Sequence, residues 1–211
     1  MVVSCLVSTI LPLVVWQLTQ QFVIVQELKL LPTPADAISV ARFLKTCPAL
    51  DKELVGTYLS YPKDVPKYEF HTKVRKAFMQ TFDFKGFSIV EALRSLLDYF
   101  RLPGEAQKIE VIVEEFADVY YGSEPGPMAE ADTAFILAYS IIMLNTDLHN
   151  PSVQHKMTTE QFLRNNRGIN KGQDLPQEFL IAIYNEIKEK ISFSFAMTFS
   201  CLLYCYFPNV E

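Results

Sequence analysis

The sequence predicts an all-α domain, for three reasons. Apolar residues between positions 36 and 190 recur at spacings of three and four, as on one face of an amphipathic helix. Residues that favour the first turn of a helix stand in front of several of these runs. Strand-like alternation is nearly absent, and all seven glycines are expected at helix ends or in loops. The 211 residues, half of them apolar, suit one domain with a sizeable core.

The first expected helix covers residues 37–46. Asp36 or Ser39 is suited to open it, because either side chain can accept a hydrogen bond from a free N–H of the first turn. Pro48 follows and cannot continue a helix. The side chains expected on its buried face are Ile38, Ala41 and Leu44.

Two more helices are expected before residue 83. Asp51 is placed to start a helix through residues 52–59. Pro66 suits a first turn leading into residues 67–82, because that turn does not need the N–H that proline lacks. The residues expected on the buried face of this helix are Phe70, Val74, Ala77 and Phe78.

Three capping boxes are expected further along the chain. In such a box a short polar side chain bonds an N–H of the first turn, and a side chain three residues later bonds back. The expected pairs are Ser88 with Glu91, Thr158 with Gln161, and Asp174 with Gln177, the last with Pro176 in the first turn.

Two long helical segments are expected to form the centre of the domain. Residues 104–121 carry Ile109, Val113 and Phe116 on one face. Residues 133–144 are apolar nearly all the way round, which indicates a helix that is buried on every side.

Both ends of the chain differ from the middle. Residues 1–26 carry no charged side chain, and residues 191–207 are apolar or hydroxylic. The first stretch lacks the basic region of a signal peptide, and the second is short for a bilayer span of about 20 residues. Membrane element, core packing, disorder and a misplaced reading frame all stay open. We therefore leave 1–27 and 191–211 unassigned and expect the domain at 28–190.

Composition argues against several classes of function. The formal net charge is -5 and there is no basic run, so nucleic acid is not an expected partner. The four cysteines lack zinc-site spacing and suit a reduced compartment, and the three histidines do not form HExxH. No GxxxxGK[ST] is present to hold a nucleotide. We expect neither a metal site nor a cofactor.

The stretch FRLPGEAQKIE, residues 100–110, isolates one acid in front of a long helix. Pro103 fixes φ and Gly104 lets another backbone come close, so Glu105 is expected on a rigid, projecting tip. No histidine or second clustered acid is near to share a proton or a metal, which suits a task that uses charge. The alternative is an ordinary first-turn acid, which the helix dipole stabilises by about 0.3–1 kcal/mol.

Two motifs resemble the signature of the Sec7 domain, the catalytic module of guanine-nucleotide exchange factors for Arf-family small GTPases. They are FRLPGEAQKIE and, at residues 132–151, DTAFILAYSIIMLNTDLHNP. SVARFLKTCPALDKELVGTYLS, FDFKGFSIVEALRSLLDYF and MTTEQFLRNNRGINKGQDLPQEFLIAIYNEIK are similar to the same family in order and spacing. The flanks FLRNNRGINKGQDLP and SVARFL most resemble the large brefeldin-A-sensitive Golgi and trans-Golgi members.

This resemblance implies a superhelix of about ten helices with a central groove. The LPGEA loop would lie on one side of the groove and the second motif on its floor. The implied activity is exchange on Arf-family GTPases, GDP-bound and nucleotide-free, without covalent chemistry and with Glu105 as the finger that promotes GDP release. The implied location is cytoplasmic, peripheral at Golgi, trans-Golgi or endosomal membranes, in vesicle trafficking. The implied partner contacts are Tyr139, Ile142, Met143, Asn145, Leu148 and Asn150.

Several residues of the second motif also have a purely structural interpretation. Ile141 and Leu144 are expected in the core, and the other aliphatic residues of the motif could join them. Asn150 precedes Pro151 and could close an Asx-turn instead of facing the groove. His149 is expected to be structural.

Four positions resemble those of family members that brefeldin A inhibits. Resistant members tend to have phenylalanine, alanine, serine and proline there. The four residues of this chain are Tyr139, Ser140, Asp147 and Met157. The hydroxyls of Tyr139 and Ser140 could instead bond helix carbonyls in a core.

Other classes of function are weaker. A catalytically silent helical Arf-binding scaffold would keep the groove without a working finger, yet the complete LPGEAQKI argues for activity. A membrane-embedded protein would need the two end segments as spans. A hydrolase would need Gly-x-Ser-x-Gly or a Cys/His pairing, and neither is found.

Overall fold

A computed structural model of the chain describes residues 35–48, 50–63 and 65–190. Over these ranges the secondary structure is helical, with no β-strand beyond an isolated bridge between Asn170 and Gln173. The predicted all-α class is therefore confirmed, while the count of about ten helices stays a prediction. The helices are α3 Ala37–Thr46, α4 Lys52–Leu59, the 3₁₀ helix η1 Pro66–Tyr68, α5 Glu69–Met79, α6 Ile89–Leu97, α7 Ala106–Ser123, α8 Ala131–His149, α9 Thr159–Asn165 and α10 Gln177–Glu189.

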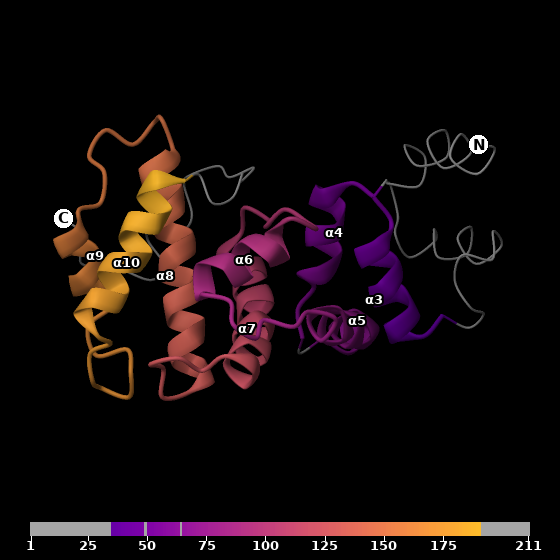
Figure 1. Cartoon of the computed structure of the whole chain (residues 1–211). Helices are drawn as coiled ribbons and strands as arrows, with labels where there is room; N and C mark the ends of the chain where they lie inside the picture. The colour runs from indigo at the N-terminus through magenta and orange to yellow at the C-terminus, as the bar shows by residue number, and fades with distance from the viewer. Residues whose placement is uncertain (1–34, 49, 64, 191–211) are drawn as a thin grey trace.

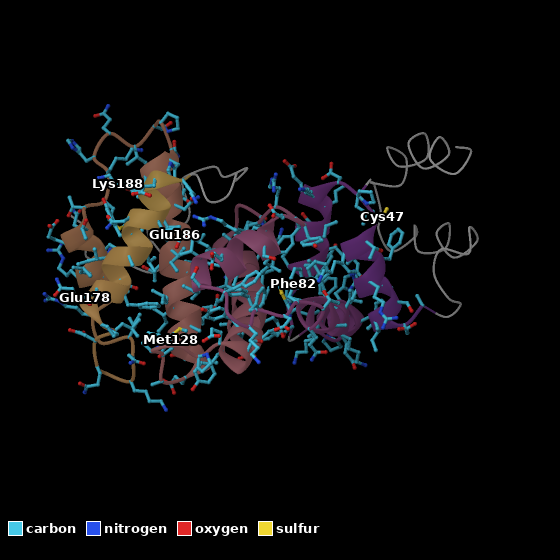
Figure 2. All side chains as sticks on the ribbon, viewed as in Figure 1. Cys47, Phe82, Met128, Glu178, Glu186 and Lys188 are labelled. Atoms are coloured by element: carbon cyan, nitrogen blue, oxygen red, sulfur yellow. The ribbon has the colours of Figure 1, made fainter. Side chains whose placement is uncertain are left out.

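The helices follow one another from one end of the molecule to the other (Figure 1). Helices α3, α4 and α5 lie at one end, α8, α9 and α10 at the other, and α6 and α7 between them. Side chains fill the spaces between them (Figure 2). None of the helices in the described ranges has the length and apolar character needed to cross a bilayer. The interpretations of 1–27 and 191–211 lie outside the described residues.

Most helix starts match the sequence prediction. Asp36 caps α3 by accepting the Ser39 N–H at 2.9 Å, and Asp51 caps α4 by accepting the Glu53 N–H at 2.8 Å. Both hydrogen bonds of the capping box are present where α6 and α9 begin. Local side-chain chemistry can specify these four starts without a tertiary contact.

The predicted capping box at α10 is wrong. The residue at the N-cap is Pro176, which makes no side-chain cap. Asp174 instead accepts the Gly168 N–H at 2.7 Å. Gly168 has φ +68, a turn conformation that brings its N–H toward Asp174. The carboxylate therefore holds a loop and not a helix.

Three smaller expectations also differ from the structure. Ile38 was expected on the buried face of α3, but it is 58% exposed and Val40 takes its place in the core. The segment after Pro66 begins as the 3₁₀ helix η1, and α5 ends at Met79, three residues early. Gly56 lies inside α4 and not at a helix end.

The central pair of helices is α7 and α8, which pack against each other more extensively than the other helix pairs. Ile109, Val113 and Phe116 of α7 are buried as predicted. In α8, every residue from Leu137 to Asn145 is buried, which confirms the expectation of a helix enclosed on nearly all sides. This arrangement makes α7 the element between the core and the site described below.

A histidine in α5 gives the fold a pH-dependent stability. His71 is buried among Tyr58, Tyr61 and Tyr68, whose ring centroids lie 4.6, 4.5 and 5.6 Å from its own. Burial, and then the charge of Arg75, lower the pKa of His71 below its ordinary value of 6.5. Below about pH 6.5 the unfolded chain binds a proton on His71 more readily than the folded chain does. The free energy of unfolding therefore falls as the pH drops below about 6.5.

We predict that His71→Phe weakens this acid destabilisation, because it keeps an aromatic ring and removes the titrating group. Melting temperatures at pH 7.5 and 5.5 measure it, and the drop in the parent should exceed that in the variant by more than about 2 °C. His155 is exposed, so His155→Gln is the matched control and should behave as the parent. Equal drops in parent and His71→Phe would contradict the prediction.

Candidate functional site

Glu105 stands at the tip between α6 and α7. It is the N-cap residue of α7, with φ -99 and ψ 126, and its side chain makes no capping hydrogen bond. The side chain is 68% exposed. Glu105 thus precedes the first turn and does not bond its N–H groups, so its carboxylate remains available to a partner.

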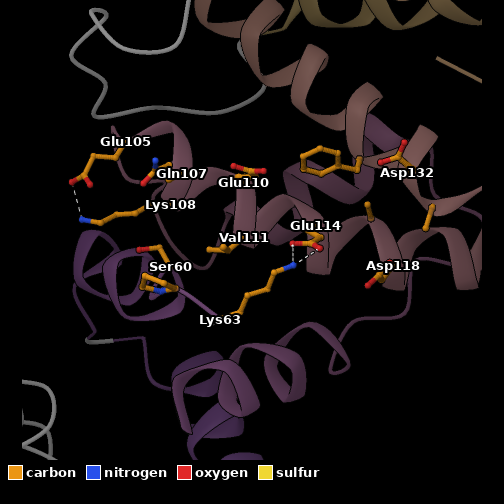
Figure 3. A pocket seen from close by; sticks show the side chains of 14 residues that line it. Ser60, Lys63, Glu105, Gln107, Lys108, Glu110, Val111, Glu114, Asp118 and Asp132 are labelled. Atoms are coloured by element: carbon orange, nitrogen blue, oxygen red, sulfur yellow. Dashed lines mark hydrogen bonds and ion pairs between the residues drawn. The ribbon is translucent and has the colours of Figure 1, made fainter. Parts of the chain in front are cut away.

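The ion pair between Glu105 and Lys108 was missed at the sequence level. The Nζ atom of Lys108 lies 2.8 Å from Oε1 of Glu105 (Figure 3). No role was assigned to Lys108 from the sequence, yet the spacing i,i+3 at a helix start is a signal for such a pair. Exposed pairs of this type are worth about 0.2–1 kcal/mol, so a partner can replace Lys108 at little cost.

A groove of about 670 Å³ runs along α7 from Glu105. One face of α7 forms its length, the first turns of α8 close the far end, and residues 60–63 form one edge (Figure 3). Lys63 ties this edge to α7 through both oxygens of Glu114, at 2.6 and 2.7 Å. The charged residues that line the groove are Glu105, Glu110, Glu114, Asp118, Asp132, Lys63 and Lys108. Five carboxylates face two lysines, so the groove is negative and favours a positively charged partner surface.

The second motif lies mostly below this groove. Phe135 lines the groove, and its ring centroid is 6.3 Å from that of Tyr139. Tyr139 is 2% exposed and Met143 6%, so α8 forms a layer under the site. Ile142 and Asn145 are also buried, and Ile141 and Leu144 lie in the core as predicted. The structure does not place these residues in one cavity with Glu105.

The residues implied in brefeldin A binding contact other parts of the fold: the ring of Tyr139 lies against that of Phe135, and hydrogen bonds place the other three. The Met157 N–H donates to Oδ2 of Asp147, so the fold joins these two residues ten positions apart. The hydroxyl of Tyr184 donates to the Met157 carbonyl at 2.8 Å. Ser140 accepts a 2.9 Å hydrogen bond from the amide of Asn166 inside the core.

A second cavity, of about 500 Å³, lies at the C-terminal end of α8. Leu148 and Met157 line it together with His149 and Tyr184. The Nε2 atom of His149 lies 2.7 Å from the carbonyl oxygen of Ile187, which agrees with the structural role expected for this histidine. The cavity is separate from the groove at Glu105.

Asn150 closes a turn. It is the C-cap of α8, half-buried, and its Oδ1 accepts the Ser152 N–H at 2.9 Å. Lys156, which was not singled out from the sequence, donates to the carbonyls of Asp147 and Asn150 at 2.8 and 2.5 Å. The Asx-turn is therefore present, and the side-chain amide nitrogen is the part of Asn150 left for a partner contact.

Within the part of the chain that the structure describes, no three His, Cys, Asp or Glu side chains are grouped so that they could hold a metal ion. The five groove carboxylates are spread along α7 and the start of α8 instead of converging. What this arrangement offers chemically is one exposed negative charge at the mouth of a negative groove.

Comparison with known proteins identifies a family. The model of the Sec7 domain matches residues 17–191. The chain is 49% identical over 160 residues to "Brefeldin A-inhibited guanine nucleotide-exchange protein 1" of Bos taurus, covering 75% of this chain and 8% of that protein. It is 49% identical over 156 residues to "Brefeldin A-inhibited guanine nucleotide-exchange protein 3" of Arabidopsis thaliana, covering 72% and 9%. The chain thus spans about a tenth of the length of these curated relatives.

Solved structures agree with this result. "Crystal structure of Sec7p catalytic domain" matches with TM-score 0.78 and 38% identity, over 90% of this chain and 98% of that one. "Structure of ARF1-GDP bound to Sec7 domain complexed with Brefeldin A" matches with TM-score 0.80 and 36% identity, over 90% and 92%.

Proposed function

The chain belongs to the Sec7 domain family, and we propose that it is a guanine-nucleotide exchange factor for Arf-family small GTPases. The observation that carries the proposal is Glu105, exposed on its tip at one end of the groove. The names of the relatives support the activity, and the structure of ARF1-GDP with a Sec7 domain supports the partner.

Glu105 acts in this proposal by charge alone. A small GTPase holds its nucleotide through Mg²⁺ and through backbone N–H groups around the β-phosphate. A carboxylate inserted there repels the phosphate, pairs with the phosphate-binding lysine of the GTPase and displaces the metal. Two unit charges at 4 Å interact by about 4 kcal/mol at an effective dielectric constant near 20, which is roughly a thousandfold in affinity. No bond is made or broken, and no cofactor is needed.

The groove and the end of α8 provide the binding energy. We propose that the GTPase first meets Leu148 and Asn150, which are half-buried. Tyr139, Ile142, Met143 and Asn145 are buried in the free chain and support the contact surface from below. Their direct contact with a partner stays a prediction.

The alternative is a catalytically silent scaffold that binds the GTPase without releasing GDP. The exposed carboxylate of Glu105 favours the active form, because its weak pair with Lys108 leaves it available. We further propose that the protein is cytoplasmic and works at Golgi, trans-Golgi or endosomal membranes in vesicle trafficking. It would be held there peripherally, through the GTPase or through regions like those that make up the rest of its longer relatives.

Release of a fluorescent guanine nucleotide tests the proposal. We expect the chain to accelerate release from an Arf-family GTPase in solution and to leave a Ras-family GTPase at its spontaneous rate. Stable binding of the Arf-family GTPase without faster release would support the scaffold. No binding and no acceleration would defeat both functions.

Asn150→Ala is predicted to slow exchange by about tenfold, through weaker docking, with little change in helicity. Asn150→Asp is the matched control, because a carboxylate still accepts the Ser152 N–H but cannot donate as the amide does. Nucleotide release and melting temperature are measured for both variants. If Asn150→Asp exchanges like the parent while Asn150→Ala only melts earlier, Asn150 is a turn residue.

A further inference from the structure

We propose that Gly56 is a positioning residue for Glu105, because it allows the loop that carries Glu105 to lie directly on α4. This inference rests on the proposed function, since it concerns the geometry of the same carboxylate. Gly56 lies inside α4, where glycine is unfavourable for the helix, so its presence there needs a reason in packing.

The reason is a close contact with the backbone of Arg101. A Cβ atom at Gly56 would lie 1.7 Å from the carbonyl oxygen of Arg101 and 2.9 Å from its carbonyl carbon. Real Cβ atoms essentially never come within 3.0 Å of another heavy atom. The obstacle is backbone, so no change of side-chain rotamer can relieve the clash. Any other residue at this position must push α4 and the loop apart.

Neighbouring contacts hold the same stretch against α4. The Arg101 N–H donates to the carbonyl of Lys52 at 2.9 Å, and Lys52 lies one helical turn before Gly56. The peptide groups on both sides of Arg101 are therefore held along one turn of α4. Phe100 and Leu102, on either side of Arg101, are both buried.

The anchored stretch is joined to Glu105 by a short connection. Only three residues separate Arg101 from Glu105: Leu102 is buried, the ring of Pro103 fixes φ, and Gly104 alone leaves freedom. A displacement of Arg101 is therefore passed on to the carboxylate. Errors of about 1 Å in the position of a reacting group can lower a rate by about a hundredfold. The groove along α7 would be altered less, because Gly56 does not line it.

The test compares two Gly→Ala substitutions inside helices. Gly56→Ala should lower kcat for nucleotide release at saturating GTPase by at least tenfold, with KM changed by less than threefold. Gly122→Ala, in the last turn of α7, is the matched control, because an added Cβ meets nothing within 4 Å. It should leave both constants at the parent values.

A second readout separates positioning from a loss of stability. Gly56→Ala should bind the nucleotide-free GTPase within about twofold of the parent per folded molecule, because Gly56 does not line the groove that carries the affinity. A purely structural defect would weaken binding and exchange by the same factor. Such equal losses, or an unchanged kcat in Gly56→Ala, would overturn the proposal.

A further variant keeps the proposal testable if Gly56→Ala does not fold. The Arg101 guanidinium donates to the carbonyl of Leu97, the last residue of α6, at 3.2 Å, so Arg101→Ala loosens a second attachment of the same stretch without adding an atom. It should lower kcat about threefold at constant KM, and an unchanged kcat would contradict the inference. If the parent itself does not accelerate release, the proposed function fails and the role of Gly56 falls with it. If the parent accelerates release and Gly56→Ala does so equally, only the role of Gly56 fails.

Discussion

Glu105→Lys is expected to lower exchange on an Arf-family GTPase by about a thousandfold, to near the spontaneous rate. The substitution replaces repulsion of the β-phosphate by attraction, and two unit charges about 4 Å apart change an affinity by roughly a thousandfold. Because Glu105 is exposed and makes no capping bond, the fold should not change. The complex with GDP-bound or nucleotide-free GTPase should still form, because the groove and α8 carry the affinity.

Glu178→Lys is the matched control for this variant. Glu178 is also an exposed acid at the start of a helix, but it lies on α10 at the end of the molecule away from α3 (Figure 2). Reversing its charge should leave exchange unchanged. Stopped-flow nucleotide release and pull-down on the nucleotide-free GTPase measure both steps. Exchange by Glu105→Lys within a few-fold of the parent would remove Glu105 from the mechanism.

Brefeldin A is expected to inhibit exchange by this chain, uncompetitively with respect to the GDP-bound GTPase. The prediction rests on the coincidence of Tyr139, Ser140, Asp147 and Met157, of which the fold joins the last two by a hydrogen bond. An interfacial inhibitor needs an apolar pocket with a few polar groups that exists only in the complex. Hydroxyl groups at Tyr139 and Ser140 can each add a hydrogen bond worth about 0.5–1.5 kcal/mol.

The double variant Tyr139→Phe, Ser140→Ala is expected to resist the drug and keep its exchange activity. The Asn166 amide loses its bond to Ser140 but still donates to the Phe162 carbonyl at 2.8 Å, so the core should tolerate the change. Thr133→Val is the control: it removes another buried hydroxyl of α8, near the N-terminal end of the helix, and should leave inhibition unchanged. Full exchange by the parent at saturating drug, with a GTPase known to form the ternary complex, would refute the prediction.

Local signals explain why much of the fold could be predicted. Asp36, Asp51, Ser88 and Thr158 start their helices through hydrogen bonds within three residues, so their effect is readable from sequence alone. Burial of α8 on nearly all sides also followed from composition, because a helix without a polar face must be enclosed.

Long-range contacts explain what could not be predicted. Asp174 looked like a cap, but its carboxylate bonds Gly168, six residues earlier, across a turn. Gly56 was grouped with the glycines of helix ends and loops, and the reason for a glycine inside α4 could not be seen, because its partner Arg101 lies 45 residues away and only the fold brings them together.

The site was predictable to a similar degree. The exposed tip at Glu105 followed from the proline and glycine before it. The groove did not, because it needs α7, α8 and residues 60–63 in one place. The burial of Tyr139 and Ile142 beneath the groove could not be predicted either, since apolar residues of one helix can face either the core or a groove.

The most direct test of the central claim is a turnover measurement. The chain is mixed with a tenfold excess of Arf-family GTPase loaded with fluorescent GDP, and excess GTP is added. If a single carboxylate catalyses release, all the GDP is expected to leave through many turnovers per chain, and Glu105→Gln should abolish the acceleration. Release confined to one GDP per chain, or equal release by Glu105→Gln, would contradict it.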